Sequence, residues 1–176
     1  MKSDVILIDS HGNGFKKAVE ETWKTAAYVG LSRKNSLRLQ LCTEEMLCLI
    51  QSVTGETQAS FWIEFENSNC EMHLTTKTEM NKEKRALLLS SATSRKNEAA
   101  NSFLGKVRDA FETAMLSDVN HEDPIPEDLL PDLVNCVIEI PEWDGYERSV
   151  LKSIADDVKI GIRGKNVELI FCKSFA

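Results

Sequence analysis

The stretch NSLRLQLCTEEMLCLIQSVTG, residues 35–55, decides the fold. Apolar residues recur in it at steps of three and four, which is the spacing of one face of an α-helix. The residues of this face are Leu39, Cys42, Met46, Leu49 and Val53. At about 100° per residue, Glu44 points away from the face and Glu45 sits at its edge. We expect a buried central helix with Glu45 beside the core, either as a boundary acid in a salt bridge or reaching into a pocket.

Composition places the chain among ordinary globular proteins with an acidic balance. The 176 residues suit one domain, and 42% hydrophobic and 28% charged residues are typical of soluble proteins. The formal net charge of −7 argues against nucleic acid as a partner. The opening MKSDVILIDSHG reads as a strand rather than a signal peptide, and no apolar run approaches the roughly 18 residues of a membrane span. We therefore expect a cytoplasmic protein.

The cysteines and histidines do not form a recognisable site. The five cysteines are Cys42, Cys48, Cys70, Cys136 and Cys172. They lie in apolar helix or strand patterns without zinc-site spacing, which predicts buried, reduced thiols in the cytosol. The histidines, His11, His73 and His121, are scattered and lack a recognisable serine or cysteine partner, so a catalytic triad is not supported.

In the first half of the chain, the pattern predicts a strand, a helix and a hairpin around the central helix. The strand covers 5–8 and ends at Gly12-Asn13-Gly14, which we interpret as a plain turn because two glycines are a weak phosphate-loop signal. A helical stripe from 15 to 27 consists of Phe15, Ala18, Val19, Thr22, Trp23, Ala26 and Ala27. Alternating strands at 59–65 and 70–76 form a hairpin with one buried face. Trp62 lies on its other face, which is either covered or a contact surface.

In the second half, we expect a helix over 79–92, a polar loop at 93–97 and a helix over 100–114 whose apolar face includes Val107 and Ala110. An exposed acidic loop at 117–131 and a strand at 134–140 follow. A helix at 146–155 precedes a closing hairpin of 158–162 and 167–171. Together these elements predict an α+β fold, a two-layer sandwich with helices on one face of a mixed, mostly antiparallel sheet, in a single domain of residues 1–176.

Three segments carry a resemblance to a known family. They are AVEETWKTAAYVGLS at 18–32, LRLQLCTEEMLCLI at 37–50 and SIADDVKIGIRGKNVELIFCK at 153–173. Their order resembles the histidine-kinase-like ATPase family, with the GHKL or Bergerat fold, and most closely its small anti-sigma-factor branch, the serine kinases that hold bacterial sigma factors. The resemblance covers roughly 15–65 and 146–173, and residues around 80–140 form an atypical insertion.

The resemblance implies an ATP site whose central helix carries a Glu and, four residues later, an Asn that binds Mg²⁺. Glu45 matches the Glu, but Leu49 stands at the Asn position and has no oxygen for a cation. Counted from Glu44, the position is Cys48, which is equally unsuited to a hard cation. The metal ligand is missing in either register.

The family's other nucleotide elements are also altered. An Asp-x-Gly-x-Gly motif that reads adenine is replaced by TKTEMN at 76–81. The glycine-rich turn for the phosphates reads DGYER at 144–148, where Gly145 is flanked by acids that repel phosphate. The polar loop 91–97 is either a solvated loop or a lid that supplies Lys96.

Two functions follow from this pattern. The first is a degenerate, catalytically inactive member of the fold that binds another protein as a regulatory module, with no cofactor. The alternative is an active ATP-binding serine kinase or ATPase, with Mg²⁺ as cofactor, Glu45 as base and Lys96 on the phosphates. Under the first hypothesis the partner is a sigma-factor-like or antagonist-like protein, and homodimer formation stays open. The candidate contact residues are Trp62, Trp143 and the loop 117–131.

Overall fold

The computed structural model describes residues 1–9, 11–54, 58–100, 106–107, 109–110, 112–113, 116, 151 and 153–175. Five strands form one open sheet in the order β1-β2-β3-β5-β4. The strands are β1 (Ile6–Ile8), β2 (Ala59–Glu66), β3 (Asn69–Lys77), β4 (Asp157–Arg163) and β5 (Asn166–Ser174). Neighbouring strands all pair antiparallel. The expected α+β class and both hairpins are confirmed, and the sheet contains no parallel pair among the described strands.

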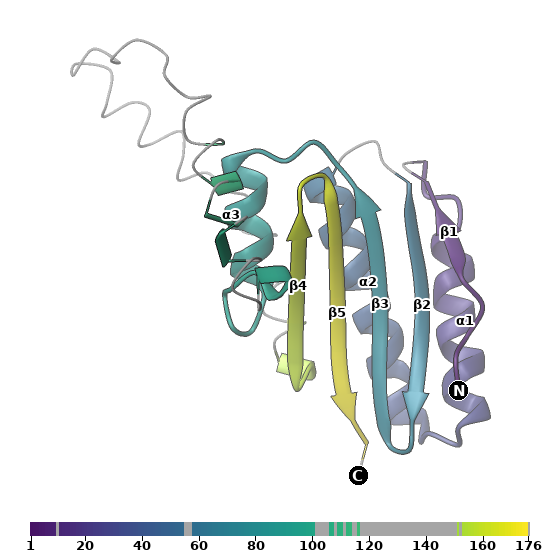
Figure 1. The fold of residues 1–176 in the computed structure, drawn as a ribbon. Coiled ribbons are helices and arrows are strands. Elements are labelled where there is room, and N and C mark those ends of the chain that lie inside the picture. The colour runs from purple at the N-terminus through teal and green to yellow at the C-terminus, as the bar shows by residue number, and fades with distance from the viewer. Residues whose placement is uncertain are drawn as a thin grey trace, which may run out of the picture.

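The described helices border this sheet, and the two longest lie behind one of its faces (Figure 1). They are α1 (Phe15–Tyr28), α2 (Arg33–Thr54), α3 (Lys82–Ser91) and the short 3₁₀ helix η1 (Glu98–Ala100). Figure 1 shows α1 behind β1 and β2, α2 behind the middle of the sheet, and α3 beside β4. Among the described residues, no helix is both long and apolar enough to cross a membrane.

The central helix α2 forms as its pattern predicts. All five residues of the expected face are buried, Glu44 is exposed and Glu45 is half-buried. The hydroxyl of Ser32 accepts a hydrogen bond from the backbone N–H of Asn35 at 3.3 Å, which caps the helix start. The hydroxyl of Thr43 lies 2.8 Å from that of Thr22 on α1 and also donates to the sulfur of Met72 on β3. These contacts fix α2 against α1 and against the sheet.

Strand alternation builds the rest of the core. On each of the four longer strands every second side chain is buried, because the period of two turns those side chains toward the helices. Phe61, Met72, Ile160, Leu169 and Phe171 are fully buried in this layer. The core therefore lies between the sheet and α1 and α2, and the opposite face of the sheet stays outside it (Figure 1).

The buried face of α1 differs from the expected stripe. Trp23 is 41% exposed and Ala27 is also exposed, whereas Thr22 and Thr25 are buried. Thr22 satisfies its hydroxyl by donating to the carbonyl of Ala18, so this polar side chain fits the tight contact with α2. The helix is rotated toward its small residues, and the large indole of Trp23 is left on the outer side.

Two described residues of the apolar face expected over 100–114 lie on the outer side. Val107 is 54% exposed and Ala110 is exposed, although both belong to the predicted apolar face. The carboxylates of Asp109 and Glu112 instead contact the sheet edge and its neighbours. Among the described residues of this segment, the acids therefore make the contacts with the fold, through charge-assisted hydrogen bonds.

The turn between β1 and α1 is held by its own polar groups. The carboxylate of Asp9 accepts the backbone N–H groups of His11 and Asn13 at 3.0 Å, and the side-chain amide of Asn13 at 2.7 Å. The Asn13 side chain is the main reason why the pKa of Asp9 is lowered. Gly14 has a φ of 94° and packs directly against the backbone of β1. These bonds agree with the interpretation of a plain turn.

The thiols are less uniformly buried than expected. Cys42 and Cys70 are buried, Cys172 is half-buried and Cys48 is exposed. Cys48 lies on the solvent side of α2, because its direction around the helix axis falls outside the arc of the buried residues. Burial raises the pKa of Cys42 to about 12 and also raises the pKa values of Cys70 and Cys172. Cys136 lies outside the described residues.

Alkylation with iodoacetamide at neutral pH therefore separates these thiols. We expect Cys48 to react at least about a hundredfold faster than Cys42 and Cys70, because only the accessible thiolate is nucleophilic. Mass spectrometry of peptides from a time course measures each site separately. Modification of Cys42 at the rate of Cys48 would show that α2 is not seated on the sheet.

Candidate functional site

The first candidate is the stretch of α2 around Glu45. Leu49, one turn beyond Glu45, is only 4% exposed and belongs to the hydrophobic core. Its methyl groups therefore occupy the place where the resembled family carries a cation ligand. Cys48, the alternative in the other register, is exposed on the outside of α2. Neither residue offers oxygen to Mg²⁺, which binds carboxylates, carbonyls and water.

The second candidate is the segment that replaces the adenine-reading motif. Thr78 is buried, its backbone N–H donates to the carbonyl of Lys165, and its hydroxyl faces the amine of Lys84. Asn81 caps α3, because its side-chain oxygen accepts the backbone N–H of Lys84 at 2.7 Å. Glu79 pairs with Lys165 of the β4–β5 turn. These contacts of the segment cap the start of α3 and hold the neighbouring β4–β5 turn.

The remaining nucleotide elements are not brought together with Glu45 by any described contact that defines a site. Lys96 is exposed, in a loop that follows the outer edge of β4. In that loop the backbone N–H of Thr93 donates to the carbonyl of Val158, and the Thr93 hydroxyl accepts the N–H of Val158 at 2.8 Å. Gly145, Trp143 and the loop 117–131 lie outside the described residues.

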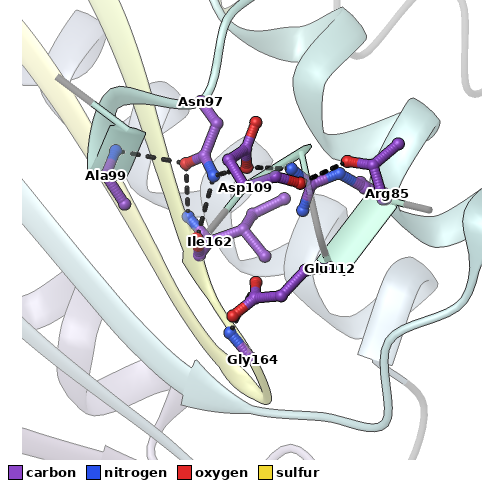
Figure 2. A network of polar contacts seen from close by, with 8 residues as sticks. Arg85, Asn97, Ala99, Asp109, Glu112, Ile162 and Gly164 are labelled. Carbon is purple, nitrogen blue, oxygen red and sulfur yellow. Dashed lines mark hydrogen bonds and ion pairs between the residues drawn. The ribbon is translucent and has the colours of Figure 1, made fainter. Parts of the chain in front are cut away.

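A network of polar contacts covers the edge of the sheet at β4 (Figure 2). The amide group of Asn97 donates to the carbonyl of Ile162 at 2.9 Å and accepts its backbone N–H at 2.8 Å. One side chain thus replaces the partner strand that an edge residue would otherwise need. The same amide donates to Asp109 and accepts the backbone N–H of Ala99.

The network continues from Asp109 toward α3 and the β4–β5 turn. The buried guanidinium of Arg85 on α3 pairs with the carboxylate of Asp109, as Figure 2 shows. Glu112 accepts the backbone N–H of Gly164 at 3.1 Å. All these groups bind protein backbone or one another, so we interpret the network as structural.

A broad hollow occupies the sheet face away from α1 and α2. Its volume is about 1300 Å³, and it is wide open to solvent. Its lining includes Leu7, Ser60, Thr75, Lys77, Lys159, Gly161, Arg163, Asn166, Glu168 and Ile170. Glu45 and Lys96 are not part of its wall. We call this surface the open-face hollow.

Beside the hollow, an aromatic stack covers the lower part of the same face. The indole of Trp62 is parallel to the ring of His73, with ring centres 4.8 Å apart, and the amine of Lys2 lies 4.9 Å from the indole centre. Glu64 accepts hydrogen bonds from Lys2 and from the indole N–H, both at 2.8 Å. The hydrogen bond from Lys2 is the main cause of the lowered pKa of Glu64. Trp62 is thus largely engaged within the fold.

The described residues do not fit a metal site. Among them, no cluster of three or more His, Cys, Asp or Glu side chains could hold an ion. A Mg²⁺ ion next to Glu45 would meet the hydrocarbon of Leu49 at the family's ligand position. Among the described residues, Leu49 therefore supplies no ligand for the Mg²⁺ of the alternative function.

Comparison with known proteins gives no relative for this chain: no protein-family model matches it, and no curated protein matches it. The functional reading therefore rests on the geometry. Sequence reasoning missed the open-face hollow, although the polar residues alternating along three strands were a usable signal. It also missed the role of Asn97, for which a single asparagine in a polar loop gives no signal.

Proposed function

We propose that this protein is a catalytically inactive member of the Bergerat-type fold that works by binding another protein as a regulatory module. The observation that carries the proposal is the burial of Leu49 in the core, one turn beyond Glu45. A hard cation at this place would have to be held next to buried hydrocarbon, which supplies no ligand atoms and disfavours charge. An anti-sigma-factor-like role is an analogy drawn from the resemblance.

Two further observations support the proposal. In the segment 76–81, the polar groups of Thr78, Glu79 and Asn81 cap α3 and bind the β4–β5 turn, which removes them from any nucleotide. The sheet also presents a broad, open surface suited to a macromolecule rather than the enclosed, mostly apolar pocket usual for a small cofactor. The buried thiols Cys42 and Cys70 fit a reducing compartment such as the cytoplasm.

The test is a calorimetric titration of ATP and ADP, with and without Mg²⁺, together with thermal unfolding at millimolar nucleotide. We expect no heat of binding and no shift in Tm. A ligand present at about 100 times its Kd stabilises the folded state by about 2.7 kcal/mol, so binding with a Kd of about 10 μM would be plain at about 1 mM.

The variant Glu45→Gln serves as the matched control, because it removes the candidate base and keeps the side chain's size. Under the proposal, this variant and the natural chain behave alike toward nucleotide. Micromolar binding by the natural chain would overturn the proposal and favour the kinase or ATPase alternative. In that case Glu45→Gln should lower turnover by on the order of a hundredfold or more.

A further inference from the structure

The floor of the open-face hollow is a row of side chains that crosses the sheet, three of which, Ser60, Thr75 and Gly161, are small. Ser60 pairs with Leu7 and Thr75, and Glu168 pairs with Thr75 and Gly161, so one register row runs from β1 to β4. The row crosses five strands, and at about 4.8 Å between strands it is about 19 Å long. This length matches about six residues of an extended chain at about 3.3 Å each.

One end of this row is bordered by another part of the chain, and the other end lies at the exposed edge strand β1. At the β1 end stands Leu7, which is 75% exposed and offers an apolar contact. At the β4 end, η1 lies close to the floor, because a Cβ placed on Gly161 would be 3.6 Å from the Cβ of Ala99. The hollow is therefore a trough of limited length with a low floor, which suits an extended peptide laid across the strands.

The walls of the trough carry more positive than negative charge along β3, β5 and β4. Lys77 and Arg163 both stand opposite Asn166 on adjacent strands, and Lys159 lies two residues from Gly161 on the same face. Within the described part of the chain, none of these three cations has a carboxylate within ion-pair distance. Glu168, diagonal to all three, is the single acid of the floor.

The two other acids of the hollow stand at its ends and are already engaged. The carboxylate of Asp9 accepts hydrogen bonds from His11 and Asn13 in the β1–α1 turn. The carboxylate of Glu98 accepts the hydroxyl of Ser94 at 2.9 Å. A ligand crossing the middle of the trough therefore meets Lys77, Lys159 and Arg163 with only Glu168 to oppose them.

From this charge pattern and shape we infer that the open-face hollow binds an acidic, extended segment of a partner protein. Its carboxylates would pair with Lys77, Lys159 and Arg163, and an apolar side chain would pack on Leu7 or Ile170. The inference rests on the proposed function, because it names the surface and the chemistry of the partner that the module would bind.

The test uses a fluorescein-labelled synthetic peptide of alternating glutamate and valine, with fluorescence anisotropy as the readout. The trough variant is Lys77→Glu with Arg163→Glu. The matched control is Lys17→Glu with Lys24→Glu, which makes the same charge change at exposed positions of α1. We expect the trough variant to bind the peptide about tenfold or more weakly, and the control to change affinity by less than about twofold. Thermal unfolding checks that both variants fold.

Two further measurements test where the peptide binds and which class of ligand the hollow prefers. NMR shift changes on adding the peptide should concentrate at the amides of Ser60, Thr75 and Gly161. Absence of peptide binding, equal weakening in both variants, or tighter binding of a single-stranded oligonucleotide would each overturn the inference. The nucleotide titration is an independent test. ATP binding would overturn the inactive-module proposal, whereas a peptide that does not bind would overturn only the assignment of the open-face hollow as the partner site.

Discussion

Replacing Asn97 by leucine is expected to destabilise the protein by on the order of 4 kcal/mol, the largest effect of any single substitution considered. Leucine has nearly the shape of asparagine but cannot hydrogen-bond. Ile162 is 2% exposed, and its backbone N–H and C=O both bind the Asn97 amide. Each buried backbone group left without a partner costs about 1–3 kcal/mol, and Asp109 and Ala99 lose a bond as well.

Urea denaturation measures this loss, and amide hydrogen exchange at Ile162 localises it. Asn69→Leu is the matched control, because Asn69 is exposed at the start of β3, and it should change stability by no more than about 0.5 kcal/mol. Equal effects of the two substitutions would mean that the Asn97 amide does not secure the edge of the sheet. Rapid exchange at Ile162 in the Asn97→Leu variant is the expected local signature.

Replacing Gly14 by alanine is expected to cost about 3 kcal/mol or more. The φ of 94° at Gly14 lies in the left-handed region, where a residue with a Cβ costs about 1–2 kcal/mol. In addition, the new Cβ would lie 2.2 Å from the carbonyl oxygen of Leu7, a backbone atom of β1 that cannot rotate away. The start of α1 would have to move off the sheet.

Gly12→Ala separates the two causes. Gly12 also has a positive φ, 80°, but a Cβ there would meet nothing within 4 Å. It should therefore cost only the conformational term, about 1–2 kcal/mol. The free energies of unfolding of the two variants, from urea denaturation, should differ by the cost of the contact with Leu7. The steric explanation would be wrong if the two substitutions proved equally destabilising.

Local periodicity was enough to predict most elements of the fold. The face of α2, the alternation along β2 and β3 and the closing hairpin of β4 and β5 all follow the sequence pattern. These patterns arise from burial, because apolar side chains that recur at the period of a helix or strand all face the same core layer.

The side of a helical segment that faces the core was harder to predict where polar contacts determine it. In α1 the Thr22–Thr43 contact turns Trp23 outward, and in residues 106–116 the carboxylates of Asp109 and Glu112 turn Val107 outward. A count of apolar residues treats such acids as surface residues. Such a count contains no information about a buried hydrogen-bonding partner on another element.

The sequence by itself determined the described helices and strands and the apolar side chain of Leu49 one turn beyond Glu45, since each depends on residues near one another in the chain. Only the tertiary structure decided the Asn97 edge contact and the open-face hollow. Asn97 and Ile162 are 65 residues apart, and the trough joins side chains from five strands through their pairing register. Such contacts depend on long-range register, which leaves no periodic trace in a single sequence.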